Sequence, residues 1–125
     1  MDIQWFTKGS QSQVTIYETN ITLNTVASRY FSSTFATLIG FNRNDSTLLI
    51  KSLNKEDALN SKYHEDDLHK ISIKPSYGRI NGKNIIRNIC KFFPLDFSSE
   101  KLHKFPCSWD EASKCLIIYL KEEIN

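Results

Sequence analysis

The chain contains 125 residues, of which 40% are hydrophobic and 24% are charged. This length fits one ordinary domain or two very small halves, and fifteen aromatic residues allow a hydrophobic core to form. The net charge of +2 is too small to indicate a polyanion-binding protein by itself. No apolar run approaches the roughly 18 residues of a membrane span, and residues 1–5 lack the pattern of a signal peptide. We therefore expect a globular protein with no membrane partner, and neither a secreted disulfide scaffold nor a collagen-like chain.

The cysteine number and the amino-acid composition indicate a cellular compartment and an origin. The odd number of cysteines, with no predicted signal peptide, favours reduced thiols that pack as small apolar side chains. The 14 Ile, 12 Lys and 10 Asn together occupy 36 positions, a bias typical of AT-rich codons. We therefore expect a cytoplasmic protein of a low-GC bacterium or of a phage-infected host cell.

The first half of the chain predicts the order strand, strand, helix, strand, strand. Residues 14–17 alternate like a strand, residues 18–20 predict a turn, and residues 21–23 predict a second short strand. Asn24 and Thr25 are suited to cap a helix, whose apolar face combines Ala27, Tyr30 and Phe31. Residues 35–41 and 47–51, with a turn at 42–46, predict a β-hairpin.

The second half predicts the same order of elements. Residues 70–74 are typical of a strand, residues 75–78 of a turn, and Asn81 of a helix cap. The following helix has an apolar face at positions i, i+3, i+4 and i+7, formed by Ile86, Ile89, Cys90 and Phe93. Residues 105–109 and 115–120, with a turn at 110–114, predict a closing hairpin.

The spacing of these elements indicates an internal repeat. Phe41 and Trp109 are 68 residues apart, as are Leu49 and Ile117, whereas Asn24 and Asn81 are 57 apart. The second copy therefore carries an insertion of about ten residues near 94–104. We interpret residues 1–53 as a first repeat with an N-terminal extension, 54–69 as an acidic linker, and 70–125 as a second repeat. The alternative is that the same order of elements recurs by chance.

Each copy alone is too short to bury a stable core. The sequence therefore predicts an α+β fold in which two β-β-α-β-β repeats interlock into one small sheet or barrel. A homodimer of the whole chain is a further alternative.

The basic residues gather in one stretch. Residues 70–91 contain six basic residues and no acidic residue: Lys70, Lys74, Arg79, Lys83, Arg87 and Lys91. The last three follow at i, i+4 and i+8, so they form a stripe on one face of the predicted helix. A basic stripe beside a turn that carries an arginine is suited to contacts with phosphates. The alternative is ordinary solvation of an exposed helix.

The segment Tyr77-Gly78-Arg79-Ile80-Asn81-Gly82-Lys83 and the helix that follows it resemble the Gly-Arg, strand, helix signature of AbrB/SpoVT-like swapped-hairpin transcription factors. Tandem copies in one chain occur in that wider group, as in MraZ-like proteins. The resemblance implies that Arg79 matches a DNA-contacting arginine and Arg87 a basic helix position. The chain departs from the pattern where Lys83 replaces the proline that opens the helix, and where Thr19-Asn20 replaces Gly-Arg in the first copy.

No catalytic or metal-binding pattern emerges from the sequence. None of the cysteines Cys90, Cys107 and Cys115 lies in a nucleophile elbow. The histidines His64, His69 and His103 are not accompanied by the closely spaced cysteine pairs of a structural zinc site. The glycines are isolated, so no phosphate-binding loop is predicted. We therefore expect no enzyme activity, no cofactor and no metal.

Two functions fit this sequence. The first is a DNA-binding regulator that contacts the phosphates of duplex DNA through Arg79, Lys83, Arg87, Lys91 and Lys74. The second is a protein-binding module, for instance a phage-encoded inhibitor of a host enzyme or defence complex. Its anchors would be the apolar residues Phe93, Leu95, Phe97 and Trp5.

Overall fold

The computed structural model describes residue 3, residues 11–60 and residues 62–124. This part of the chain contains eight strands, three short α-helices and two 3-10 turns. In chain order they are β1 (Gln13–Tyr17), β2 (Asn20–Leu23), α1 (Thr25–Arg29), β3 (Ala36–Asn42), β4 (Thr47–Leu53), α2 (Lys55–Ala58), η1 (Glu65–Asp67), β5 (Ser72–Ile73), β6 (Gly78–Asn81), α3 (Lys83–Phe92), β7 (Leu102–Asp110), β8 (Cys115–Tyr119) and η2 (Leu120–Glu122). None of the helices among these residues has the length and apolar character needed to cross a membrane.

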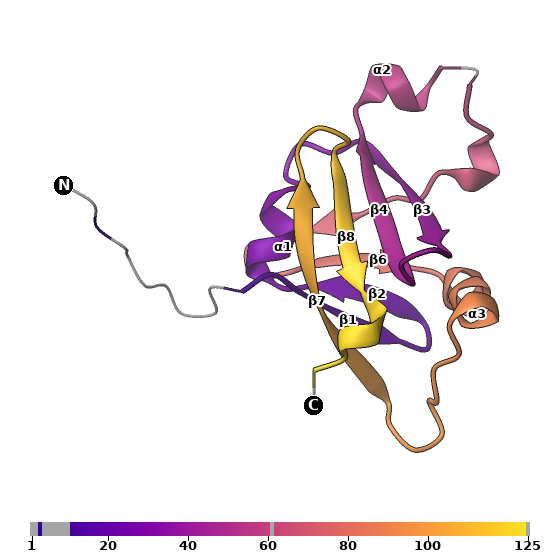
Figure 1. The fold of residues 1–125 in the computed structure, drawn as a ribbon. Helices are drawn as coiled ribbons and strands as arrows, with labels where there is room; N and C mark the ends of the chain where they lie inside the picture. The colour runs from indigo at the N-terminus through magenta and orange to yellow at the C-terminus, as the bar shows by residue number, and fades with distance from the viewer. Residues whose placement is uncertain (1–2, 4–10, 61, 125) are drawn as a thin grey trace.

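All eight strands belong to one antiparallel sheet that curls into a half-barrel (Figure 1). The strand order is β3-β4-β8-β7-β1-β2-β6-β5, so hairpins from the two halves of the chain alternate across the sheet. The long strand β7 joins the two parts, because residues 102–106 pair with β1 and residues 107–110 pair with β8. The expected α+β class is confirmed.

The helix caps differ between α1 and α3. Asn24 caps α1 as expected, with its side-chain oxygen accepting the N–H of Ala27 at 3.0 Å. The expectation that Asn81 caps α3 is wrong, because Asn81 ends strand β6 and pairs with Asn20. Gly82 occupies the cap position instead, with a φ of +157° that an L side chain rarely adopts.

The segment between the halves packs on the sheet. Ala58, at the end of α2, is buried with Ala36 of β3 and Leu53 of β4, and Tyr63 and Leu68 pack against them. A bridge between Thr37 and His69 then fastens the chain to β3 just before β5 begins. The described residues of the 54–69 segment are thus docked on the β3–β4 hairpin through a few apolar contacts.

The core lies on the concave side of the sheet. Its largest fully buried side chains are Phe31 and Phe105, which are joined by aliphatic residues from seven strands and from α3. In α3 these are Ile86 and Ile89, two of the residues that the helical spacing predicts. Because side chains alternate along a strand, the residues between these positions point to the convex side.

Candidate nucleic-acid interface

One row of polar side chains crosses the convex side of five adjacent strands. Thr15 of β1 lies opposite Lys104 of β7 on one side and Thr22 of β2 on the other. Thr22 in turn lies opposite Arg79 of β6, and Arg79 lies opposite Ser72 of β5. Directly opposed residues share a face of the sheet, so all five side chains point to the same side. The row thus has a cation near each end and hydroxyl groups between them.

The rest of this convex face is also free of carboxylates. Within the strands β1, β2, β5, β6 and the part of β7 that pairs with β1, the described residues include no Asp or Glu. The remaining outward positions hold amide, aromatic and apolar residues: Gln13, Tyr17, Asn20, Asn81, Leu102 and Pro106. We call these positions, together with the row, the convex face.

The exposed guanidinium of Arg79 is held over the ring of Tyr77, with 5.1 Å between the Cζ atom and the ring centroid. This stacking orients the side chain without neutralising its charge. Lys104 is likewise exposed, and no acidic partner for it or for Arg79 occurs among the described residues. Both cations are therefore available to an anion.

The helix residues predicted to bind phosphate form a separate surface. Lys83, Arg87 and Lys91 are all exposed on α3, whose opposite face is buried through Ile86 and Ile89. The only polar contact among the three is a long one of 3.4 Å from Arg87 to Asn84, within the residues described. Lys83 and Arg87 also line a pocket of about 260 Å³, together with Glu18, Ile86, Cys90 and Phe97.

Sequence reasoning found part of this surface. Lys74 is exposed in the turn between β5 and β6, beside the convex face. Lys104 was missed, because it lies outside the basic stretch at 70–91 and joins Arg79 only through the pairing of β7 with β1. The strand was predicted to begin only at residue 105, so Lys104 fell within the expected insertion near 94–104, whereas β7 begins at Leu102 and Lys104 alternates there with the buried His103 and Phe105.

The residues of the alternative protein interface have mainly structural contacts. Phe93, Leu95 and Phe97 are half-buried and pack against the core, and Phe97 also meets the ring of His103 edge-on at 5.2 Å. Trp5 lies outside the described residues.

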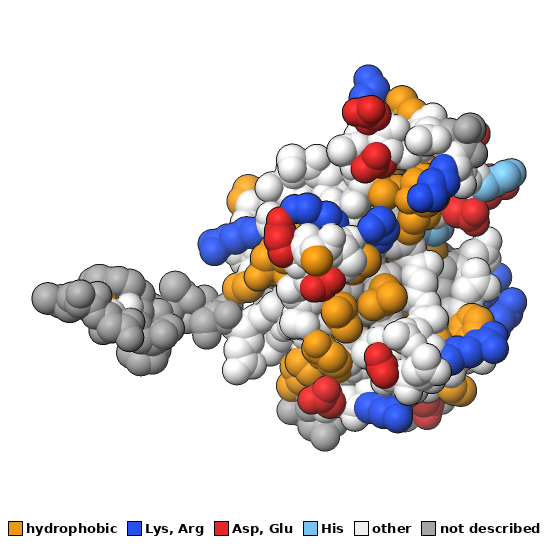
Figure 2. All heavy atoms as spheres, turned by 45° about the horizontal axis from the view of Figure 1, so that its top comes forward, with side chains coloured by type: hydrophobic (Ala, Val, Ile, Leu, Met, Phe, Trp, Pro, Cys, Tyr) orange, Lys and Arg blue, Asp and Glu red, His pale blue; other side chains and the backbone are white. Residues whose placement is uncertain are grey.

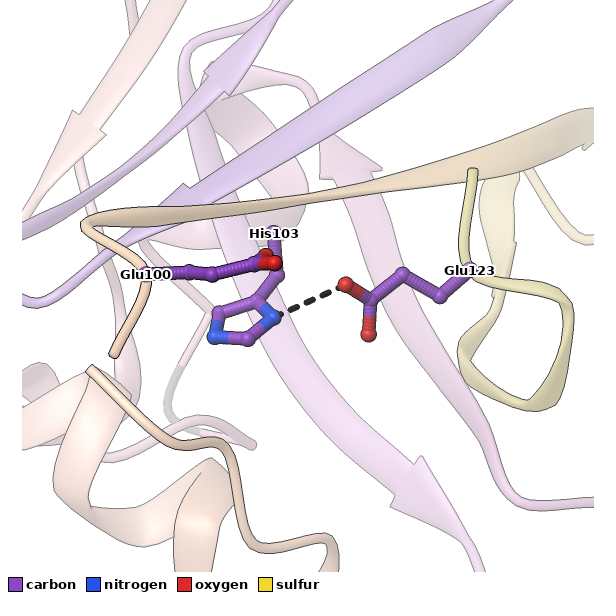
Figure 3. A group of neighbouring side chains, drawn as sticks. All are labelled: Glu100, His103 and Glu123. Atoms are coloured by element: carbon purple, nitrogen blue, oxygen red, sulfur yellow. Dashed lines mark hydrogen bonds and ion pairs between the residues drawn. The ribbon is translucent and has the colours of Figure 1, made fainter. Parts of the chain in front are cut away.

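A charged cluster closes one end of the half-barrel. His103, only 7% exposed, points from β7 toward Glu123, with 2.9 Å between its Nδ1 and the carboxylate, and Glu100 lies beside them (Figure 3). The other ring nitrogen, Nε2, donates to the backbone carbonyl of Asp96 at 2.8 Å. Because a carbonyl and an ionised carboxylate only accept hydrogen bonds, both contacts form together when each ring nitrogen carries a proton, so the geometry favours the imidazolium form.

Within the described residues, the same cluster is the set of side chains most suited to a metal. Donor atoms of Glu100, His103 and Glu123 lie within 4.8 Å of one another. A metal would have to replace the proton on Nδ1 of His103, which already binds Glu123. Burial lowers the pKa of His103, but the hydrogen bonds to Glu123 and Asp96 outweigh it and raise the pKa overall. The arrangement therefore favours an ion pair that fastens the loop at 93–101 and the C-terminal segment to β7.

The cysteines are free thiols and each is half-buried. Burial raises the pKa of Cys107 to about 11, although a contact with the hydroxyl of Ser12 at 3.0 Å acts in the opposite direction. Such a thiol is a weak nucleophile at neutral pH.

Comparison with protein-family models, curated proteins and solved structures finds nothing that matches this chain.

Proposed function

We propose that this protein is a DNA-binding regulator whose convex face contacts the phosphates of duplex DNA. The observation that carries the proposal is that, among the described residues, this face holds no carboxylate and its cations Arg79 and Lys104 have no acidic partner, with hydroxyls between them. Three strand spacings of about 4.8 Å separate the backbones of the two cations, a distance of about 14 Å. Cations, hydroxyls and side-chain amides are the groups that most often bind the DNA backbone.

The proposal includes an architecture of two interlocked swapped-hairpin repeats, and the strand registers support it. Thr15 pairs with Thr22, and the residues 57 positions later, Ser72 and Arg79, also pair. In the second hairpin, Ile39 pairs with Ile50, and the residues 68 positions later, Cys107 and Ile118, also pair. The internal repeat in the sequence gives the same two spacings, 57 and 68 residues, independently of the structure.

The contacts between the copies support the same symmetry. Thr22 pairs with Arg79, its counterpart 57 positions later, and Leu49 pairs with Ile117, its counterpart 68 positions later. A twofold axis requires a ladder of this kind, in which a residue meets its own equivalent.

Aromatic packing between the copies is also reciprocal. Phe41, on the hairpin of the first copy, stacks on Phe92 at the end of α3, with ring centroids 5.3 Å apart. Trp109, on the hairpin of the second copy, stacks on Tyr30 at the end of α1, with centroids 4.9 Å apart. Each helix therefore packs on the other copy's hairpin, as expected for interlocked repeats.

This architecture strengthens the resemblance to AbrB/SpoVT-like swapped-hairpin transcription factors. In such a symmetric arrangement both copies would carry the basic residue, whereas here Arg79 has Thr22 as its equivalent. We therefore assign the phosphate binding of the convex face to one copy, through Arg79, Lys104 and Lys74. Lys83, Arg87 and Lys91 form a separate basic surface on α3.

Fluorescence anisotropy with a labelled duplex of about 20 base pairs tests the proposal at low salt. We expect binding that weakens steeply as salt is added, and that weakens several-fold in Arg79→Ala and in Lys104→Ala. Lys55→Ala on α2 removes the same charge away from the convex face and should bind like the wild type. The absence of any binding at low salt would refute the function.

A further inference from the structure

The sheet has one recessed open edge, along β3. The N–H of Thr37 donates to the carbonyl of His69 at 2.8 Å, and the N–H of His69 donates to the carbonyl of Thr37 at 2.9 Å. Because the outward direction alternates along an antiparallel strand, the N–H and C=O groups of Ile39 and Phe41 point the same way as those of Thr37. No other described residue bonds to these four groups. The edge therefore offers two donors and two acceptors in the geometry of a strand.

A hollow lies on each side of this edge. On the concave side, a pocket of about 260 Å³ is lined mainly by the apolar residues Ile39, Phe41, Leu48, Ile85, Ile89 and Phe92. On the convex side, a pocket of about 590 Å³ includes Leu38, Leu49, Lys51, Tyr63 and Asp67. The two pockets share Ile39, Gly40, Asp66, His69 and Asn88, so they meet at the edge itself.

We propose that this edge binds an extended peptide segment of a partner protein by strand addition. Side chains of an added strand alternate between the two faces of a sheet, so they would enter the two pockets in turn. This site is independent of the DNA-binding surface proposed above. It also differs from the protein interface expected at Phe93, Leu95 and Phe97.

The surroundings of the edge define the peptide's direction and chemistry. An antiparallel peptide continues the pairing that Thr37 makes with His69, and it ends beside η1. Its residues opposite Phe41 and Ile39 point into the concave pocket and should be aliphatic. The residue between them lies over Gly40, where a Cβ atom would meet nothing within 4 Å, so an aromatic side chain fits there.

Charge determines the last position of the peptide. Asp66 and Asp67 are exposed and line the convex pocket, and their closest ionic partner among the described residues is His64, 3.7 Å from Asp66. The two lysines of this pocket are engaged elsewhere: Lys51 donates to the carbonyl of Ser113, and Lys62 lies over the ring of Tyr63. Figure 2 shows acidic and histidine side chains gathered at the right of its view. A lysine or arginine after the second aliphatic residue would meet these carboxylates.

The segments that flank the groove leave room for a single added strand. The 62–69 segment borders one side through Asp66 and His69, and α3 borders the other through Asn84 and Asn88 (Figure 1). A second copy of the chain would bring its own η1 and α3 beside its β3. These elements would collide with η1 and α3 of the first copy before the two edges could pair.

NMR titration of the ¹⁵N-labelled full chain with the peptide acetyl-Ser-Val-Tyr-Ile-Lys-Ser-amide tests the site. We expect the amide signals of Ile39 and Phe41 to shift at millimolar peptide, and the amide of Ile39 to exchange more slowly with solvent. N-methylation of the peptide's isoleucine removes the N–H that bonds to Ile39, and should weaken binding at least tenfold. Replacement of the peptide's lysine by glutamate should weaken it several-fold.

Two protein variants locate the binding. Asn88→Trp places a large side chain where the two pockets meet and should abolish the shifts, whereas Ser33→Trp, exposed elsewhere, should preserve them. The proposal is overturned if the Ile39 and Phe41 signals do not move, if the N-methylated peptide binds equally well, or if the peptide merely promotes self-association of the chain.

Discussion

The ion pair between His103 and Glu123 gives a pH-dependent contribution to stability. The fold favours a protonated His103, because Nδ1 and Nε2 both face acceptors, the Glu123 carboxylate at 2.9 Å and the Asp96 carbonyl at 2.8 Å. Burial opposes the charge, but the hydrogen bonds raise the pKa of His103 above its ordinary value of 6.5. A raised pKa means that the folded state holds the proton more tightly than the unfolded state. The stabilisation is therefore complete below about pH 6.5 and is lost as the pH rises through the folded pKa.

A double-mutant cycle of His103→Gln and Glu123→Gln measures this contribution. Hydrogen bonds to charged groups contribute about 1.5–3 kcal/mol, and Glu123 is partly exposed, so we expect a coupling energy of about 1.5 kcal/mol near pH 5.5. Near pH 9 the coupling should fall below about 0.5 kcal/mol, because the neutral ring loses one of its two donors. Urea unfolding of the four proteins at both pH values provides the free energies. Equal coupling at the two pH values would refute the assignment of an imidazolium.

Three further variants test local features of the fold. Asn24→Ala removes the cap of α1 and a contact of 3.2 Å to the N–H of Gln13, so it should lower the free energy of unfolding in urea by about 1–2 kcal/mol. Asn54→Ala, at the exposed cap of α2, should lower it by only about 0.5 kcal/mol. Gly82→Ala should cost about 1–3 kcal/mol, because its Cβ atom would lie 2.9 Å from Ile85 at a strained φ, whereas Gly40→Ala should change stability little. In a variant that keeps only Cys107, alkylation at about pH 8 should be about 100-fold slower in the folded than in the unfolded protein, since its pKa is about 11; similar rates would contradict the burial of this thiol.

Local patterns predicted the elements well. The alternation at residues 14–17, the cap at Asn24 and the helical spacing of Ile86 and Ile89 each depend on neighbours in the sequence, and each occurs in the structure. The predicted strand at 70–74 shortens to Ser72–Ile73, because the preceding His69 pairs with Thr37 rather than with β6. That competition involves a distant strand, which no local pattern reveals.

The candidate sites depended more on tertiary pairing. Arg79 could be found from its neighbours, but its companion Lys104 comes from a strand whose pairing with β1 joins residues 89 positions apart, as in Thr15 with Lys104. The open edge of β3 could not be predicted at all, since it results from a bridge that ends after a single pair. Pairing order across a sheet is what single-sequence patterns leave undetermined.

The salt dependence of DNA binding tests the central claim most directly. Each phosphate contact contributes about 0.9 to the slope of log affinity against log salt. The double variant Arg79→Ala/Lys104→Ala should therefore reduce the slope by about 1.8 relative to the wild type, while Lys55→Ala leaves it unchanged. An equal slope in the double variant and the wild type would contradict the assignment of the convex face as the DNA-binding surface.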